Sequence, residues 1–316
     1  MSKITLCEVA ERLKTQDNIL ILCHRSPDGD TIGSAYALYY ALTSMGKTCT
    51  VDCSDEIPLK YDYITKPANF KSFTPEYTVA VDVADKPMLG KKYDKITPDL
   101  VIDHHISNTL YGKESCVIDN GANCENIYEL IKILGADIDI NIANALYTGI
   151  ATDTGCFKFS NTTANTHIIA AQLITDGADI QSINRVMFEV KTRSRLEVER
   201  YVYDKIEIFA DGKAAIVAIP YCIVENANAK SEDLDGITGL PRQIDGVVLG
   251  ITLREQKDGS LRVSVRTHPP IDASKFCSAF GGGGHIRAAG CSVAGNISDA
   301  VQQLKNKALE TLGDLK

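Results

Sequence analysis

Long apolar segments are missing from this 316-residue sequence. A membrane-spanning helix needs about 20 consecutive apolar residues, and the apolar run at 19–23 is far too short to span a bilayer or to form the core of a signal peptide. The first residues, MSKITLCEVAERLK, also lack the basic-then-apolar plan of a secretory signal. We therefore expect a cytoplasmic protein without a membrane partner.

Paired cysteines and an excess of basic charge are missing as well. The 10 cysteines are scattered without a CxxC motif, so we expect reduced, buried thiols rather than disulfides. The 33 basic residues are outnumbered by 41 acidic ones, and the resulting net charge of −8 argues against binding of long duplex nucleic acid through counterion release. Any nucleic acid that this protein handles should be short.

Two common catalytic loops are also absent. The chain contains neither a P-loop nor the GxSxG turn that exposes a nucleophilic serine. Ser26 and Ser34 are therefore not candidate nucleophiles, and we expect a chemistry that needs no nucleophile from the protein.

The first half of the chain alternates short apolar runs with segments of helical spacing. Segments such as 31–46 carry apolar residues at helical intervals and end on glycine. This alternation is typical of a parallel α/β sheet. The predicted strands are 18–24, 48–53, 78–85, 99–105 and 114–119, and two further helices are predicted at 124–134 and 141–151.

The pattern changes after about residue 185. The charged segment 186–206 is predicted to be a helical linker. Beyond it, apolar strands separated by DGK and KDGS turns indicate hairpins, and helices are expected near 273–280 and 298–312. We therefore predict an N-terminal parallel-sheet domain over 1–185, the linker, and a smaller α+β C-terminal domain over 207–316.

Residues that can bind metals end three of the predicted strands. His24 follows ILIL, Asp82 follows VAV, and Asp103 leads into His104 and His105. The carboxyl ends of the strands form the rim where ligands bind in open α/β sheets. These side chains should therefore converge at one edge of the sheet.

Three further carboxylates are candidates for the same rim. Asp28 and Asp30 project from one tight turn, and Asp153 ends the helical pattern that begins near Asn141. Taken singly, such a turn is usually a solvated turn, and an aspartate that ends a strand is commonly a helix cap. Their joint placement favours a metal site, because buried carboxylates without partners are costly and divalent cations would supply the partners.

The charges of these side chains suit two ions. Four aspartates would balance two divalent cations, and His24 and His104 would be neutral ligands. Mixed Asp and His ligation without cysteine suits Mn²⁺ better than a closed zinc site, and Mg²⁺ is also compatible.

Five segments of the chain form recognisable motifs: HRSPDGDTIGS (24–34), VAVDVAD (79–85), DHH (103–105), ATDTGCF (151–157) and GGGGHIRAAG (281–290). The first four resemble the successive motifs of the DHH phosphoesterase superfamily, and the fifth resembles the signature of the DHH-associated C-terminal domain. The resemblance covers nearly the whole chain in the expected order. Within the superfamily, the length and the pairing of domains resemble the nanoRNases, or oligoribonucleases, which cleave very short RNA and often dephosphorylate 3′-phosphoadenosine 5′-phosphate (pAp).

The resemblance implies a set of ligands for two ions and a bridging role for Asp82. Two divalent ions about 3.5–4 Å apart could share a water, lower its pKa and aim it at phosphorus. One ion is expected between His24, Asp28 and Asp82, and the other between Asp30, Asp82, His104 and Asp153.

The resemblance also implies catalytic and substrate-binding roles. Asp103 should fix the ring orientation of its neighbours, and His105 should face the substrate phosphate, so Asp82, Asp103 and His105 are the predicted catalytic residues. In the second domain, Arg266 is the candidate phosphate clamp. We expect the active site to lie in a cleft between the two domains.

The glycine run of the second domain is expected to hold substrate. Four consecutive glycines are too permissive for a helix or strand, but they let backbone N–H groups crowd around an anion. By itself, such a run is more often a flexible loop. The predicted substrate-binding residues here are Gly282, Gly283, Gly284, His285 and Arg287.

Three functions remain open at this point. The first is a metal-dependent phosphoesterase that hydrolyses RNA of about 2–5 nucleotides to mononucleotides and converts pAp to AMP and phosphate. The second is a phosphodiesterase of signalling dinucleotides such as cyclic di-AMP or pApA. The third, a non-catalytic nucleotide-binding regulator, is disfavoured by the intact set of ligands. The expected partners are short oligonucleotides and nucleotide phosphate esters, and a homodimer is compatible with the sequence.

Overall fold

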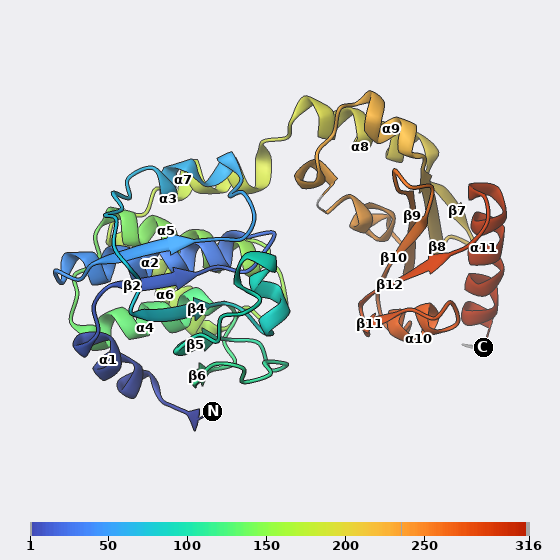
Figure 1. Ribbon diagram of the computed structural model, residues 1–316. Coiled ribbons are helices and arrows are strands. Elements are labelled where there is room, and N and C mark those ends of the chain that lie inside the picture. Colours follow the sequence, from blue (N-terminus) through green and yellow to red (C-terminus); the bar gives the residue numbers. More distant parts are fainter. Residues whose placement is uncertain (1, 235, 314–316) are drawn as a thin grey trace. The chain divides into compact units, whose positions relative to one another are not determined.

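Residues 2–234 and 236–313 are described by a computed structural model. Contacts between residues divide the chain into two units, Met1–Val190 and Lys191–Lys316. Each unit has its own sheet (Figure 1). Each unit also has its own hydrophobic core.

A six-stranded sheet forms the centre of the first unit. Its strand order is β1-β6-β5-β4-β2-β3, and all of its paired strands are parallel, which confirms the predicted fold. The five predicted strands are present, and the short strand β1 is an addition that its exposed polar residues do not signal. The strands are β1 (Ser2–Lys3), β2 (Ile19–Leu22), β3 (Cys49–Asp52), β4 (Tyr77–Val81), β5 (Leu100–Asp103) and β6 (Glu114–Val117).

Helices cover one face of this sheet, and short turns cover the other. Ile19 and Ile21 share a core with α2, α4 and α5, whereas Leu20 and Leu22 pack in a cluster with the 3-10 turns η2 and η3. Because β2 is buried on both faces, its sequence is a continuous apolar run. The elements are α1 (Leu6–Thr15), α2 (Gly29–Ser44), α3 (Asp62–Thr65), η2 (Lys86–Leu89), η3 (Lys91–Tyr93), α4 (Asn123–Leu134), α5 (Ile140–Asp153), α6 (Ala164–Thr175) and α7 (Ile180–Asn184).

The strand order reverses at β2. The chain passes from β2 to β3 on one side, and β4, β5 and β6 then follow on the other side. Ligands of open α/β sheets bind beyond the carboxyl ends of the strands at such a reversal. The fold therefore places a binding rim at the ends of β2 and β4.

The second unit contains a mixed sheet of order β11-β12-β10-β9-β8-β7, as expected for an α+β domain. Strands β8 and β9 are parallel, and the other paired strands are antiparallel. Both helices predicted in this part of the chain are present as α10 and α11. The elements are α8 (Arg193–Lys205), β7 (Glu207–Phe209), β8 (Ala214–Ile219), α9 (Tyr221–Asn226), η6 (Ile237–Gln243), β9 (Leu249–Glu255), β10 (Leu261–Thr267), α10 (Ala273–Ser278), β11 (Gly283–His285), β12 (Ala288–Val293) and α11 (Ile297–Gly313).

Helices pack on both faces of this second sheet. One face shares a core with α10 and α11, and the other packs with α8, α9 and η6. Helix α8 lies in the segment 186–206 that the sequence predicts to be a linker. Its Val198 and Val202 are buried in a cluster with Val217 of β8, so this helix belongs to the second unit.

The glycine run differs from the prediction. We predicted that it would be too permissive for a strand, and this was wrong, because Gly283–His285 forms strand β11 and pairs with β12. A Cβ atom on Gly282 would lie 2.2 Å from the carbonyl oxygen of Gly290, so the glycine allows the two segments of the hairpin to approach each other closely. The hydrogen bonds of the hairpin, rather than local propensity, determine the conformation here.

Two expectations about membranes and thiols can be compared with the structure. Among residues 2–234 and 236–313, no helix is both long and apolar enough to cross a bilayer. All 10 cysteines are free thiols, as predicted, but Cys7 and Cys222 are exposed rather than buried.

Candidate metal centre

Three neighbouring strands bring the predicted ligands to one rim. β2, β4 and β5 lie side by side, and His24, Asp82 and the run Asp103–His105 lie at or just beyond their carboxyl ends. His24 and Asp82 are 7% and 2% exposed, so these polar groups are enclosed by the protein. Because these parallel strands are neighbours, side chains that are far apart in the sequence form one cluster at the rim of the sheet.

The first turn of α2 adds two carboxylates. Asp28 is the N-cap, and its Oδ1 accepts hydrogen bonds from the backbone N–H groups of Asp30 (3.0 Å) and Thr31 (3.1 Å). The Asp28 carboxylate remains exposed, whereas Asp30 is buried. The PDGD turn therefore begins a helix and also delivers two candidate ligands.

The beginning of α4 holds the carboxylate of Asp30. Its Oδ2 accepts a hydrogen bond from the Asn123 N–H (2.6 Å), and its Oδ1 accepts one from the Cys124 N–H (2.9 Å). A Cβ atom on Gly149 of α5 would lie 2.8 Å from Asp30 Oδ1 and 2.2 Å from Cys124 Sγ. A glycine at this position therefore makes room for the carboxylate between three helices.

The ligand atoms form three groups, which overlap at Asp82 and His104. Within each group the offered atoms all lie within 4.8 Å of one another, and the groups are His24–Asp28–Asp82, Asp82–His104–His105 and Asp30–His104–Asp153. His24 Nε2 is 3.8 Å from Asp82 Oδ2, and His104 Nε2 is 3.5 Å from Asp82 Oδ1. Each oxygen of Asp82 therefore faces a different histidine.

The two histidines are oriented as metal ligands. Nδ1 of His24 lies 2.7 Å from the carbonyl oxygen of Arg25, and Nδ1 of His104 lies 2.9 Å from that of Asn120. A carbonyl oxygen can only accept, so each Nδ1 carries a proton, and in the neutral ring the lone pair of Nε2 points toward the carboxylates. A neutral ring in this tautomer can bind a metal ion through Nε2.

Asp82 has a buried oxygen that a cation could contact. Its Oδ1 is buried and has no hydrogen-bond partner among the described residues. Burial and then the charge of Asp30 raise the pKa of Asp82 well above its usual value. Asp82 also has a left-handed backbone (φ 58°), an uncommon conformation that a short polar residue tolerates. The donor set of carboxylates and imidazoles fits divalent cations.

Comparisons with known proteins agree with this geometry. The DHH family, N-terminal domain, matches residues 18–150, and the DHHA1 domain matches residues 213–314. A protein of Thermus thermophilus, named bifunctional oligoribonuclease and PAP phosphatase NrnA, is 30% identical, and the match covers 96% of this chain and 93% of that protein. The chain belongs to the DHH family.

Another relative of this DHH-family protein matches nearly its full length, and a solved structure shares its fold. A Streptococcus mutans protein, named probable bifunctional oligoribonuclease and PAP phosphatase NrnA, is 28% identical over 94% of this chain and 97% of its own. The crystal structure of an exopolyphosphatase-related protein from Bacteroides fragilis matches with a TM-score of 0.86 and 23% identity, covering 98% of this chain and 96% of that one. The chain is thus a DHH-family hydrolytic phosphoesterase.

Asp103 and His105 contact each other beside the other candidate ligands, and His105 is itself close enough to Asp82 and His104 to share a metal ion with them. Asp103 Oδ1 lies 2.8 Å from His105 Nδ1 and accepts from the His104 N–H at 2.9 Å, and its Oδ2 accepts from Asn108 Nδ2 at 2.5 Å. Burial opposes ionisation of Asp103, but these hydrogen bonds outweigh it and hold the pKa of Asp103 below its usual value. The hydrogen bond to Asp103 raises the pKa of His105.

Asp153, in the last turn of α5, forms one of these groups with Asp30 and His104. Its side chain is partly exposed, and Oδ2 lies 3.8 Å from His104 Nε2. Burial, followed by the charge of Asp30, raises the pKa of Asp153 to about 7. The metal-free cluster therefore resists full ionisation near neutral pH.

Apart from His105, the predicted substrate-binding residues lie in the second unit. Arg266 is paired with Ala288 across β10 and β12, and His285 is paired with the same Ala288 across β11 and β12. Arg266 and His285 therefore lie in one row across the sheet. Arg287 is engaged in the protein, because its Nη1 donates to the carbonyl oxygen of Ile271 at 2.8 Å.

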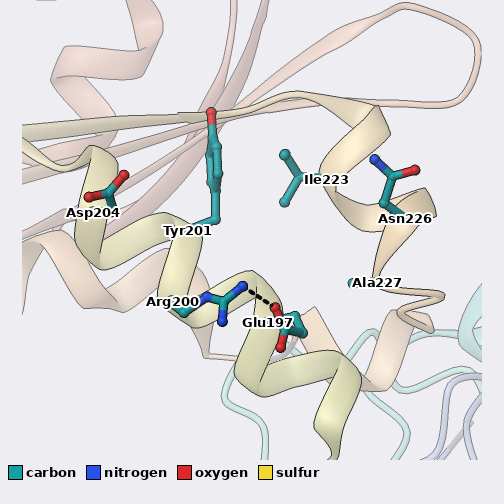
Figure 2. Close-up of a pocket in the computed structure, with 7 residues that line it drawn as sticks. All are labelled: Glu197, Arg200, Tyr201, Asp204, Ile223, Asn226 and Ala227. Carbon is teal, nitrogen blue, oxygen red and sulfur yellow. Dashed lines mark ion pairs between the residues drawn. The ribbon is translucent and has the colours of Figure 1, made fainter.

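A separate pocket lies between α8 and α9 of the second unit (Figure 2). Its charged side chains Glu197 and Arg200 pair with each other at 2.7 Å, and Tyr201 projects beside Ile223. The pocket contains none of the predicted site residues. We assign it no role.

Sequence reasoning missed the groups that support the ligands. The N–H groups of Asn123 and Cys124 carry no signal of their own, since any residue except proline has one. Gly149 could have been found as a glycine inside an apolar helix, where it is otherwise unfavourable.

Proposed function

We propose that this DHH-family protein is a two-metal phosphoesterase that hydrolyses RNA of about 2–5 nucleotides to mononucleotides and releases phosphate from pAp. One observation carries the proposal. The two oxygens of Asp82 face His24 and His104, which belong to different groups of ligands. A carboxylate in this position can join two cation sites.

The residues present would hold both ions. His24, Asp28 and Asp82 would bind one ion, and Asp30, Asp82, His104 and Asp153 would bind the other, with Mn²⁺ preferred over Mg²⁺. Two such ions generate a nucleophile from water at neutral pH and neutralise charge on the phosphoryl group.

The protein's own groups orient these ligands and the substrate. The carbonyl oxygens of Arg25 and Asn120 fix the histidine rings, and the N–H groups at the start of α4 fix Asp30. Asp103 holds His105 through Nδ1, which leaves the other ring nitrogen to contact a phosphate oxygen. The raised pKa of His105 favours the cationic form that an anionic substrate needs.

Substrate size is inferred from charge and from the relatives. The net charge of −8 disfavours long polyanions. The relatives from Thermus thermophilus and Streptococcus mutans are named as oligoribonucleases and PAP phosphatases, the second as a probable one, and they match this chain over nearly its full length. We extend their substrate class to this protein.

A substrate panel tests the proposal. The wild-type protein is incubated with end-labelled RNA of 2–30 residues, pAp, cyclic di-AMP and pyrophosphate, each with Mn²⁺ and with Mg²⁺. Asp82→Asn is the control for a contaminating nuclease. We expect the shortest RNAs to be hydrolysed fastest, pAp to release phosphate, and Mn²⁺ to give the higher rate.

Three outcomes of the panel would contradict the proposal. Equal rates on a 30-residue strand and a trinucleotide would contradict the size limit. Preference for cyclic di-AMP over every linear oligomer would indicate a phosphodiesterase of signalling dinucleotides. Absence of turnover of any substrate with either metal would indicate a regulator that binds nucleotides without hydrolysing them.

A further inference from the structure

Two thiols lie on the same face of the second sheet. Cys277 belongs to α10 and is buried in the core that this helix shares with the sheet. Cys291 belongs to β12, is partly buried and packs against the same core. Strand register pairs Cys291 with the core residue Val263 of β10, and directly paired residues project to the same face of a sheet. The side chain of Cys291 therefore points to the face that α10 covers.

The backbone of Gly282 contacts both cysteines. Its N–H donates to the carbonyl oxygen of Cys277 at 3.0 Å. A Cβ atom on Gly282 would lie 2.4 Å from Cβ of Cys291 and 2.7 Å from its Cα. Gly282 also begins the predicted substrate-binding run of the hairpin. A change in the bonding of the two thiols therefore acts directly on this run.

The two thiols form a hydrogen bond in which Cys277 donates to the sulfur of Cys291. This bond, together with burial, raises the pKa of Cys277, and the same bond lowers the pKa of Cys291. The thiolate is the form of cysteine that reacts with oxidants. Because Cys291 is also the more accessible of the two, it should react first. Reversibly oxidised cysteines commonly have a low pKa, some exposure and a second thiol beside them.

We propose that Cys277 and Cys291 form a site of reversible oxidation by peroxides, and that their disulfide restrains the hairpin predicted to hold substrate. The Cys291 thiolate attacks one oxygen of hydrogen peroxide, so an S–O bond forms, the O–O bond breaks and hydroxide leaves. The sulfur of Cys277 then attacks the oxidised sulfur, so the S–S bond forms, the S–O bond breaks and a second hydroxide leaves. The two thiol protons convert both hydroxides to water. Two thiols are oxidised and one peroxide is reduced.

The disulfide should weaken binding of substrate. A covalent bond brings the two sulfur atoms closer together than a hydrogen bond does, so α10 and β12 must shift toward each other. Gly282 already contacts Cys291 closely, and the hairpin must therefore move with them. Loss of one charge-assisted contact to phosphate corresponds to about tenfold in affinity. This effect rests on the proposed function, because it assumes that the hairpin holds short RNA, whereas formation of the disulfide does not.

Peptide mapping tests the disulfide itself. Metal-free protein is treated with a stoichiometric amount of hydrogen peroxide, alkylated and digested with trypsin. Cleavage after Lys275, Arg287 and Lys305 places the two cysteines in separate peptides, 276–287 and 288–305. We expect mass spectrometry to find these peptides joined after peroxide and separate after dithiothreitol. Absence of joined peptides from the oxidised protein would overturn the inference.

Calorimetric titration with an RNA trinucleotide tests the effect on binding. Reduced and oxidised forms of metal-free wild type, Cys277→Ala and Cys222→Ser are compared, and thermal denaturation shows that each variant folds. Cys222→Ser is the matched control, since Cys222 is an exposed thiol of the same unit.

Oxidation should raise the Kd of wild type and of Cys222→Ser about tenfold. Dithiothreitol should restore the original Kd, and Cys277→Ala should keep the Kd of its reduced form. Equal Kd values for the two forms of wild type, or the same rise in Cys277→Ala, would overturn the inference. The comparison of the two wild-type forms decides the matter even if Cys277→Ala does not fold.

Turnover after addition of Mn²⁺ separates this inference from the proposed function. If the joined peptides form, the Kd rises on oxidation and neither form hydrolyses the trinucleotide, the oxidation site stands and the proposed function fails. If the reduced protein hydrolyses the trinucleotide but peroxide neither joins the peptides nor changes the Kd, the proposed function stands and the inference is wrong.

Discussion

The two units gather uncompensated charge of opposite sign. In the first, the carboxylates of Asp30, Asp82 and Asp153 crowd the ends of parallel strands. In the second, Arg242 and Arg266 lie over the face of a mixed sheet without an acidic partner among the described residues. The negative cluster is suited to cations, and the positive pair is suited to an anion.

The two regions differ in how firmly the protein holds them. Each histidine ligand is fixed by a carbonyl oxygen, and Asp30 is fixed by two backbone N–H groups. Arg266 makes a single hydrogen bond, to the carbonyl oxygen of Val265, within the described chain. The side chains of the candidate metal centre are therefore held in place by the protein itself, whereas the guanidinium of Arg266 keeps most of its donors free of partners within the described chain. Substitutions in the two regions should therefore impair different properties of the protein.

The largest effect should follow loss of the bridging carboxylate. Asp82→Asn should lower kcat by about 10³-fold or more and abolish binding of both ions, because one oxygen of Asp82 serves each group of ligands. Asp52→Asn is the matched control, since Asp52 also ends a parallel strand but pairs with Lys92. Metal content and kcat are measured together. Near-normal turnover in Asp82→Asn would refute the bridging role.

A smaller effect, on binding alone, is expected in the second unit. Arg266→Ala should raise KM by about tenfold or more while the metal content stays at the wild-type level, since the guanidinium is proposed to contact phosphate and not the ions. Elemental analysis of the purified variant checks the second statement. Loss of metal would show that Arg266 supports the metal centre instead.

Crowding the support of Asp30 should act on stability and on one ion. In Gly149→Ala the new Cβ would meet Cys124 Sγ and Asp30 Oδ1, so the free energy of unfolding should fall by about 1–3 kcal/mol. Affinity for the ion held by Asp30 should fall as well. Urea denaturation and metal titration measure the two effects. Wild-type values in both would mean that the helices move apart without cost.

The smallest expected effect is a pH dependence of the metal-free protein. The pKa of Asp153 is raised to about 7, so the stability it contributes is complete below the unfolded value near 3.8 and is lost as pH rises through 7. Metal-free protein should therefore melt at a lower temperature at pH 8 than at pH 6, by roughly 2–4 °C. Added Mn²⁺ should stabilise more at pH 8, because it binds the ionised carboxylates. A Tm that rises with pH in the chelated protein would contradict this.

The sequence predicted the first unit well because its signals are local. Continuous apolar runs such as ILIL identify buried parallel strands, and their carboxyl ends then place His24 and Asp82 on one rim. The supports of this site depend on contacts between distant segments. Nothing near residue 30 reveals that the N–H groups of Asn123 and Cys124 hold its carboxylate.

The second unit was harder to predict for the same reason. Strand β11 forms from glycines only because β12 pairs with it, and Arg242 reaches Arg266 only through the register of β9 with β10. No local sequence pattern predicts either feature. Arg266 and His285 were identified from the family resemblance, and the sheet register then placed them in one row.

Crystals of the protein grown or soaked with Mn²⁺ provide the most direct test of the metal centre. Anomalous difference maps at the manganese absorption edge locate each ion without reference to activity. We predict two peaks, one in contact with His24, Asp28 and Asp82 and the other in contact with Asp30, Asp82, His104 and Asp153. A single peak, or two peaks that do not share Asp82, would contradict the two-metal account.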